Sequence, residues 1–258
     1  MDEAIAKTGG VVAKLKQVRA GLLHDLLTRG LDGNGQLRDP IAHPEQFRDS
    51  PLGRIPTEWL VAPLRHFIAS AEYGTSTSLS GDGTLPVLRM NNLANGEALL
   101  ADLKYATCPI PRGLLLHEGD VLFNRTNSYE HVGRTGIWRC QLPMATFASY
   151  LVRLNPFAGR LASEFLNLLL NMPESQQRMR QFATPAVQQV NINPTSLQQM
   201  LVAVPKNVSE QRRIVDVANE GARSIAAEEQ KLRKLIALKS GLMSDLLTGR
   251  VRVSEGLA

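Results

Sequence analysis

The chain has 258 residues, of which 43% are hydrophobic and 21% charged, and its formal net charge at pH 7 is +5. This composition excludes wholesale disorder, because it supplies enough apolar side chains for a core. No run approaches the ~18 consecutive apolar residues of a transmembrane helix, and the acidic start does not resemble a signal peptide. We therefore expect a cytoplasmic protein whose two cysteines, Cys108 and Cys140, are reduced thiols.

The positive charge favours an anionic partner, and its distribution is uneven. Between residues 49 and 205, eleven of the twelve basic residues are arginine and only Lys104 is lysine. The planar fork of arginine suits guanine edges and phosphates, whereas lysine acts mostly as a point charge. A high genomic GC content would produce the same bias, so the bias alone does not decide between the two explanations.

The first predicted element is a helix from near Glu3 to Arg29. Its apolar residues recur at spacings of three or four, as in Val11, Leu15, Val18, Leu22 and Leu26. Gly30 is placed to end it as a left-handed C-cap. Residues 30–62 are rich in glycine and proline and indicate a connector.

The middle of the chain predicts a mixed, strand-rich domain. Candidate strands cover residues 84–90, 120–124, 134–139, 145–153 and 200–204. Helical patterns cover 161–172, with Ser163 as a cap, and 174–183, and Pro173 separates them.

A second long helix is predicted after this domain. Ser209 is a suitable N-cap, an apolar stripe continues to Leu246, and Gly249 can end it. A helix of about 40 residues spans roughly 60 Å and needs a partner to cover its stripe. Its last part repeats the first helix, since residues 234–248 match residues 14–28 at eight of fifteen positions, including a shared G-L-x-x-D-L-L-T.

This repeat at both ends indicates one structural unit that brackets a different domain. We expect the two helices to form an antiparallel coiled coil, because the intervening domain begins and ends at the same end of the pair. The expected contacts place Leu235, Leu238 and Leu242 on Leu15, Val18 and Leu22. The alternative is that both helices pack on the globular domain.

Patterns typical of catalysis are absent from the sequence. The five histidines are scattered without zinc-ligand spacing, and there is no phosphate-binding loop or nucleophile elbow. Asn155-Pro156-Phe157 and Asn193-Pro194-Thr195 lack the second proline of an amino-methyltransferase motif, and no glycine-rich cofactor strand precedes them. The residues therefore give no support to a catalytic site, and we expect no metal and no cofactor.

Planar polar side chains concentrate in three segments, 123–136, 175–181 and 187–199. Asparagine and glutamine can bind adenine edges in a fork, and arginine can bind guanine edges. The alternative is that these residues make turns and caps, which we prefer for Asn193 before Pro194. The predicted DNA-binding residues are Arg89, Asn91, Asn124, Arg125, Asn127, Ser128, Arg134, Gln176, Arg178, Arg180, Gln188 and Gln189.

Motifs spread along the whole chain resemble one family. They are Pro51-Leu-Gly-Arg-Ile-Pro with Trp59, Leu88-Arg-Met-Asn-Asn-Leu, Gly119-Asp-Val-Leu-Phe-Asn-Arg-Thr-Asn, Val190-Asn-Ile-Asn-Pro-Thr-Ser-Leu, Val204-Pro with Glu210-Gln-Arg-Arg-Ile, and Gly241-Leu-Met-Ser-Asp-Leu-Leu-Thr-Gly-Arg. In this order they resemble the specificity subunit of type I restriction-modification systems, over roughly half of a full-length subunit.

The resemblance implies an α+β fold in which a target-recognition domain, 49–205, lies between helical regions, 1–48 and 206–258. It implies a subunit that has no catalytic role of its own and directs methyltransferase and restriction subunits to a two-part DNA sequence. Full-length members have two recognition domains and this chain has one. It is either a natural half-subunit or part of a longer chain.

Two rival functions remain open at this stage. One is a coiled-coil adaptor that binds protein and has lost DNA reading, and the weaker one is an enzyme for a small molecule. If the chain reads DNA alone, one domain recognises one half-site. A second copy, with its 241–248 motif in the place of its mate's 21–28, would then give an interrupted palindrome. A different half-subunit would give an asymmetric site.

Overall fold

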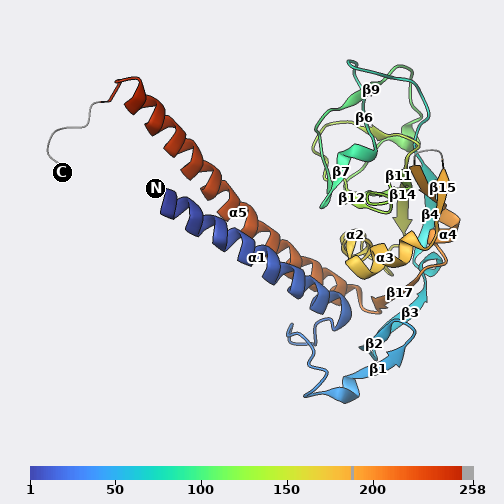
Figure 1. Ribbon diagram of the computed structural model, residues 1–258. Coiled ribbons are helices and arrows are strands. Elements are labelled where there is room, and N and C mark those ends of the chain that lie inside the picture. Colours follow the sequence, from blue (N-terminus) through green and yellow to red (C-terminus); the bar gives the residue numbers. More distant parts are fainter. Residues whose placement is uncertain (187–188, 252–258) are drawn as a thin grey trace. The chain divides into compact units, whose positions relative to one another are not determined.

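The computed structural model describes residues 1–186 and 189–251, which fold into two compact units. Unit 1 consists of Met1–His24 and the chain from Asp216 onward, and unit 2 consists of Asp25–Val215. Unit 2 is rich in short strands, and unit 1 is a pair of helices (Figure 1). The expected α+β class, a strand-rich domain flanked by two long helices, is confirmed.

The strands of unit 2 are mostly short. In chain order they are β1 Phe47–Ser50, β2 Gly53–Pro56, β3 Trp59–Pro63, β4 Ile68–Tyr73, β5 Leu79–Ser80, β6 Pro86–Leu88, β7 Leu93–Ala94, β8 Gly96–Ala98, β9 Lys104–Ala106, β10 Val121–Asn124, β11 Thr126–Asn127, β12 Thr135–Ile137, β13 Thr146–Phe147, β14 Leu151–Pro156, β15 Ala183–Ala186, β16 Gln189–Ile192 and β17 Leu201–Pro205.

A six-stranded sheet with the order β4-β14-β10-β12-β8-β7 forms the centre of unit 2. Strand β10 is buried along its whole length and pairs antiparallel with both β12 and β14. The predicted single strand at 145–153 is wrong, because it is two strands in different sheets. Between them the chain turns at Ala148–Leu151, where the Leu151 N–H donates to the Ala148 carbonyl.

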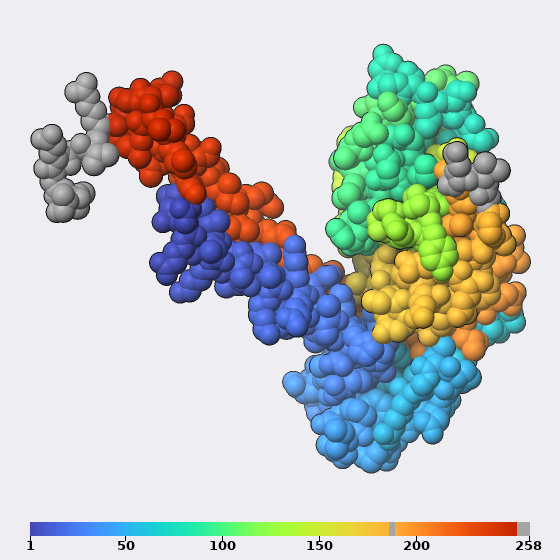
Figure 2. Space-filling model, in the orientation of Figure 1, coloured from blue at the N-terminus to red at the C-terminus, as the bar shows by residue number. Residues whose placement is uncertain are grey.

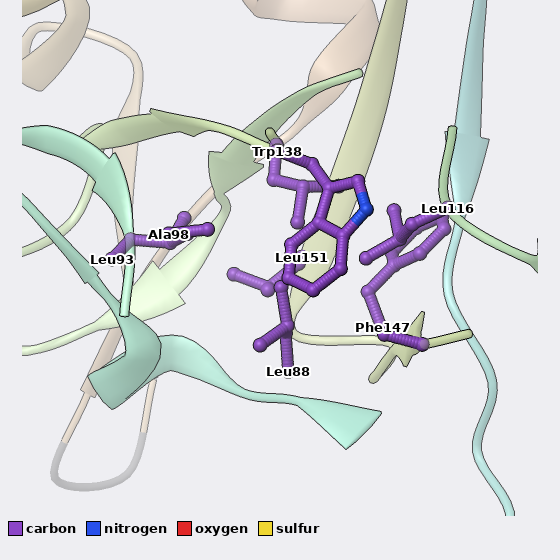
Figure 3. Close-up of a cluster of buried hydrophobic side chains, with 9 residues drawn as sticks. Leu88, Leu93, Ala98, Leu116, Trp138, Phe147 and Leu151 are labelled. Carbon is purple, nitrogen blue, oxygen red and sulfur yellow. The ribbon is translucent and has the colours of Figure 1, made fainter. Parts of the chain in front are cut away.

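The second sheet of the core has the order β13-β6-β9-β5. Apolar side chains from this sheet and from the central sheet form one cluster (Figure 3). Leu88 of β6 and Phe147 of β13 meet Leu122 of β10 and Leu151 of β14, and Trp138 lies among them. All five are at most 1% exposed, so burial of apolar surface holds the two sheets together.

Two helices, α2 Ser163–Asn171 and α3 Pro173–Arg180, follow β14 and complete this domain. Phe165 and Leu169, at a spacing of four, are buried in α2. Pro173 takes the first position of α3, where its missing N–H removes no helical hydrogen bond. The predicted break between two helices at this proline is confirmed.

A buried carboxylate joins the two ends of unit 2. Glu210 Oε1 accepts hydrogen bonds from Arg38 Nη1 at 2.6 Å, from the Trp59 indole at 3.1 Å and from the Leu31 amide at 3.1 Å. Gly30, with φ of +65°, is the predicted left-handed residue after the first helix, and it turns the chain so that Leu31 faces the carboxylate. Burial lowers the pKa of Arg38, but its bonds to Glu210 and Glu58 outweigh burial and raise it.

Replacing Glu210 with glutamine removes the buried charge partner of Arg38 and leaves only the exposed Glu58, so we expect Glu210→Gln to lower the free energy of unfolding by about 3–5 kcal/mol. Urea unfolding of the full chain measures this change. The matched control is Glu229→Gln, which removes a more exposed ion pair with Lys16 and should cost less than about 1 kcal/mol. Equal losses in the two variants would contradict the structural role of Glu210.

Unit 1 contains the paired parts of two long helices, α1 Asp2–Thr28 and α5 Val208–Leu247. The two helices lie side by side and antiparallel (Figure 1), with Lys16 bonded to Glu229 at 2.7 Å and Lys239 bonded to Asp2. The predicted antiparallel pair is therefore confirmed. The predicted N-cap of α5 is wrong, because the Asn207 side chain, not that of Ser209, accepts a hydrogen bond in the first turn.

The predicted register of the helix pair is also wrong. Leu238 and Leu242 are 61% and 48% exposed, and Val18 is 54% exposed. The two ion pairs shift the helices by ~3–4 turns from the expected contacts. An apolar stripe repeats along each helix, so its periodicity does not choose between registers. In the observed register, residues 240–248, here called the overhang, lie beyond the Asp2–Lys239 pair.

Two adjacent valines test this register. Val12 is 7% exposed and Val11 is 43% exposed. We expect Val12→Ala to destabilise the helix pair by about 1.5 kcal/mol, at ~0.8 kcal/mol for each buried methyl group. Val11→Ala should change stability by less than ~0.5 kcal/mol. Thermal unfolding followed by circular dichroism measures both, and a larger loss for Val11→Ala would reverse the assignment of the faces.

Candidate nucleic-acid interface

Three strand ends meet at one edge of the central sheet. Strand β10 ends at Asn124, which pairs with Leu151 at the start of β14, and the end of β4, Tyr73, pairs with Val152. Arg125 directly follows β10, and its amide donates to the Tyr150 carbonyl at 3.0 Å. This edge brings the Arg125 guanidinium to 5.2 Å from the centre of the Tyr73 ring.

The segment from Asn124 to Arg134 forms a closed loop at this edge. The Gly133 amide donates to the Asn124 carbonyl, and the Asn124 amide donates to the Arg134 carbonyl, both at 2.8 Å. Ser128 Oγ lies 2.8 Å from His131 Nδ1 and fixes the turn at the tip. The loop base is therefore rigid, while Ser128 and Tyr129 at the tip are exposed.

Two of the predicted DNA-binding residues, Asn124 and Gln176, are buried and hold this loop in place. The Asn124 side-chain amide donates to the Met90 carbonyl at 3.1 Å. The Gln176 amide donates to the carbonyls of Gly133 at 2.9 Å and Leu170 at 2.7 Å, which ties α3 to the loop. Their polar groups serve the framework, so our proposal for the interface leaves them out.

Through the Gln176 bond to Gly133, two further arginines of α3 lie beside the loop. The Arg180 guanidinium is 5.8 Å from the centre of the Tyr129 ring. Arg178 lies two residues before it and donates to Ser175 Oγ at 3.3 Å. In the space-filling view the green segment of the loop lies against the gold segment of α3 (Figure 2).

We call this region the arginine surface and define it by Arg125, Asn127, Ser128, Arg134, Arg178 and Arg180. Its four arginines are all partly buried, and none of them makes an ion pair within residues 1–186 and 189–251. Burial lowers the pKa of Arg178, and the charge of Glu174 only partly opposes this effect. Guanidinium groups in this state are suited to bind an external acceptor such as phosphate or a base edge.

Two arginines elsewhere in unit 2 have carboxylate partners. Arg153 bonds to Glu72 and Asp120, and Arg139 bonds to Glu97 through both ends of its fork. The predicted contacts Arg89 and Asn91 follow the same pattern, since both donate to Asp102, at 2.8 and 3.4 Å. Because their side-chain donors are already bonded to Asp102, we do not include these two residues in the arginine surface.

The remaining predicted residues lie on the hairpin β15–β16. Strand β16 pairs with β11, which places Val190 opposite Asn127, and Gln189 precedes it as a partly buried residue. Gln188 lies outside the residues that the structure describes. Asn193 caps a short helix, α4 Pro194–Leu197, by accepting from the Thr195 amide at 2.9 Å, in agreement with the preferred interpretation.

Sequence reasoning missed the two tyrosines of this site. Tyr73 and Tyr129 are 48% and 59% exposed, and each lies on an arginine of the surface. Tyr129 directly follows the predicted residue Ser128, so its place in the sequence could have indicated that it belongs to the site. Tyr73 is 52 residues before Arg125 in the chain, and only the sheet register brings them together.

The described residues offer neither a metal-binding cluster nor a membrane span. In the described part of the chain, no three histidine, cysteine or acidic side chains are grouped so that they could hold a metal ion. No helix of residues 1–186 or 189–251 combines the length and apolar character of a membrane span.

Known proteins resemble the chain in sequence and in fold, although no family model matches it. It is 24% identical over 208 residues to the putative type I restriction enzyme MjaX specificity subunit of Methanocaldococcus jannaschii, covering 79% of this chain and 49% of that protein. The chain thus spans about half the length of the curated relative it matches.

Three solved structures share the fold. The type I restriction-modification S subunit from M. genitalium has a TM-score of 0.55 and 13% identity, over 93% of this chain and 56% of that one. The HsdS subunit from Thermoanaerobacter tengcongensis has a TM-score of 0.50 and 20% identity, over 94% and 57%. A chain from a study of assembly and conformational transition of the type I R-M system has a TM-score of 0.53 and 20% identity, over the same shares.

The sequence match and the fold matches are independent kinds of observation, and both lead to the same class of protein. The resemblance of this chain to the specificity subunits of type I restriction-modification systems, at about half their length, is confirmed.

Proposed function

We propose that this protein is a sequence-specific DNA-recognition subunit of a type I restriction-modification complex, and that it has no catalytic role of its own. It directs methyltransferase and restriction subunits to a two-part DNA site. The observation that carries the proposal is the arginine surface, where four partly buried arginines make no ion pair within the described residues and lie on or beside a loop with an exposed tip. The resemblance to specificity subunits supports the same function.

The chemistry of the surface fits duplex DNA. Arginines bind phosphates and guanine edges, while Asn127 at the end of β11 and Ser128 at the tip supply donors and acceptors for other base edges. In this proposal residues 49–205 read the DNA. Residues 1–48 and 206–258 supply the helices that set the spacing of half-sites and dock the methyltransferase. Gln188 and Gln189 stay candidates for DNA contacts.

The rival is an adaptor that retains the helices and binds only protein. The exposed apolar side chains of α5 are compatible with it. The rival gives no reason for four arginines on the same surface that make no ion pair within the described residues, since unpaired half-buried charges lower stability unless a ligand uses them. We therefore prefer DNA recognition.

DNA binding is tested with the duplex that methylome sequencing of cells carrying the system identifies. Affinity for this duplex should fall steeply with salt, by roughly one log unit per log unit of salt for each phosphate contacted. We expect Arg178→Ala and Arg125→Ala to weaken binding by about 1–3 kcal/mol each. Fluorescence anisotropy over a salt series measures both effects.

The control for these variants is Arg160→Ala. Arg160 is exposed near the opposite end of β14 and stacks on Phe157, 5.3 Å from its ring centre, away from the arginine surface. It should bind like the unchanged protein. A flat salt dependence would support the adaptor, and unchanged binding in both surface variants would place the interface elsewhere.

A second copy of this chain is our proposed partner at the overhang. Exposed apolar residues gather there, and they are Leu242, Met243, Leu246 and Leu247. In the first copy of the repeat, the matching Leu26 and Leu27 are buried. A second copy was expected to put its residues 241–248 in the place of residues 21–28 of the first copy. That place is already filled by the chain's own first helix. We therefore locate the contact between copies on the overhang itself.

Light scattering of the full chain should give the mass of a dimer, and Leu242→Lys with Leu246→Lys should reduce it to a monomer, because charges replace apolar contacts. Ile41→Lys, at an exposed apolar site of the connector, should remain a dimer. A monomer that still directs methylation, or an asymmetric methylated site with no second specificity chain present, would contradict the symmetric pair.

A further inference from the structure

The two tyrosines of the interface differ from other aromatic partners of arginine in this protein. Five arginines lie over aromatic rings in the described residues, and the two that belong to the arginine surface lie on tyrosines. Both tyrosines come from elements other than that of their arginine. Tyr73 ends β4 and Arg125 follows β10, while Tyr129 lies on the loop and Arg180 ends α3.

Stacking restricts how each guanidinium can turn. The group is held near the ring, at 5.2 Å for Arg125 and 5.8 Å for Arg180, and the attraction between cation and ring favours contact with the ring face. The Nε atom of each arginine is buried and has no partner among the described residues. The donors at the outer end of the guanidinium are therefore the ones free to reach a ligand.

A fixed plane matters for one class of acceptor more than another. Guanine presents N7 and O6 side by side in the major groove, and a fork must be coplanar with them to bind both. Phosphate oxygens accept from many directions, so a phosphate contact needs no such orientation. A ring that holds the guanidinium reduces its conformational entropy before DNA binds. This ordering favours a guanine contact, which depends on the plane of the guanidinium, more than a phosphate contact.

We propose that Tyr73 and Tyr129 are positioning residues that hold Arg125 and Arg180 for forked contacts with two guanines of the recognised half-site. This inference rests on the proposed function and deepens it, since it names guanine as the base that each pair recognises. Each tyrosine acts through its arginine, so the ring is needed and the hydroxyl is not.

The test uses the full chain and the duplex identified from the methylome, with each guanine of the half-site replaced in turn by 7-deazaguanine. This base pairs normally but lacks the N7 acceptor. The unchanged protein should lose ~10-fold in affinity at two guanines. Arg125→Ala should be insensitive to the replacement at one of them, and Arg180→Ala at the other.

The tyrosine variants separate positioning from simple contact. Tyr73→Leu should lose sensitivity at the same guanine as Arg125→Ala, while Tyr73→Phe should keep it, and Tyr129 should behave likewise with Arg180. The pair Phe157–Arg160 supplies the control, because Phe157→Leu should leave every response unchanged. Melting temperatures of all variants check that the domain remains folded.

The outcomes distinguish the inference from the function on which it rests. If the unchanged protein does not prefer this duplex to an unrelated one, the proposed function fails. If it prefers the duplex but Tyr73→Leu and Tyr129→Leu keep the sensitivity to 7-deazaguanine, or weaken all duplexes alike, only the positioning role fails. A half-site without guanine would also overturn it.

Discussion

The buried Glu210 carboxylate is the constraint on which the arrangement of the chain depends. It collects donors from Leu31, just after α1, and from Arg38 and Trp59, while Glu210 itself lies in the first turn of α5. The end of the first helix and the start of the last one are thereby fixed at one point. Two helices that meet in this way and pack side by side must run antiparallel, and the ion pairs Lys16–Glu229 and Asp2–Lys239 show that they do.

The motifs that carry the family resemblance describe this framework more than the reading surface. Trp59 and Glu210 belong to two of them, and the neighbouring Gln211 accepts from the Ala162 amide and donates to the carbonyls of Arg160 and Pro205. Buried polar groups must be satisfied, so such residues tolerate little change. A likeness in these motifs therefore identifies the fold and leaves the recognised DNA sequence undetermined.

Sequence reasoning predicted the parts whose signal is local. The helix periodicity, Gly30 and Pro173 led to correct elements, whereas β4 was missed because IASAEY shows no clear alternation. The choice of planar side chains as DNA contacts did not separate Asn124 and Gln176, which are buried, from exposed ones. The arginines are a separate case, because a guanidinium is seldom buried without an ion pair, and within the described residues Arg125, Arg134, Arg178 and Arg180 make none.

The division between framework and reading surface also explains how specificity could vary on this fold. Asn124 and Gly133 close the loop through backbone bonds at its base, and Gln176 ties it to α3. Ser128 and Tyr129 at the tip are exposed and lie outside the buried core. Substitutions at the tip can therefore alter the groups offered to DNA while the buried bonds keep the position of the loop, which separates the evolution of specificity from that of stability.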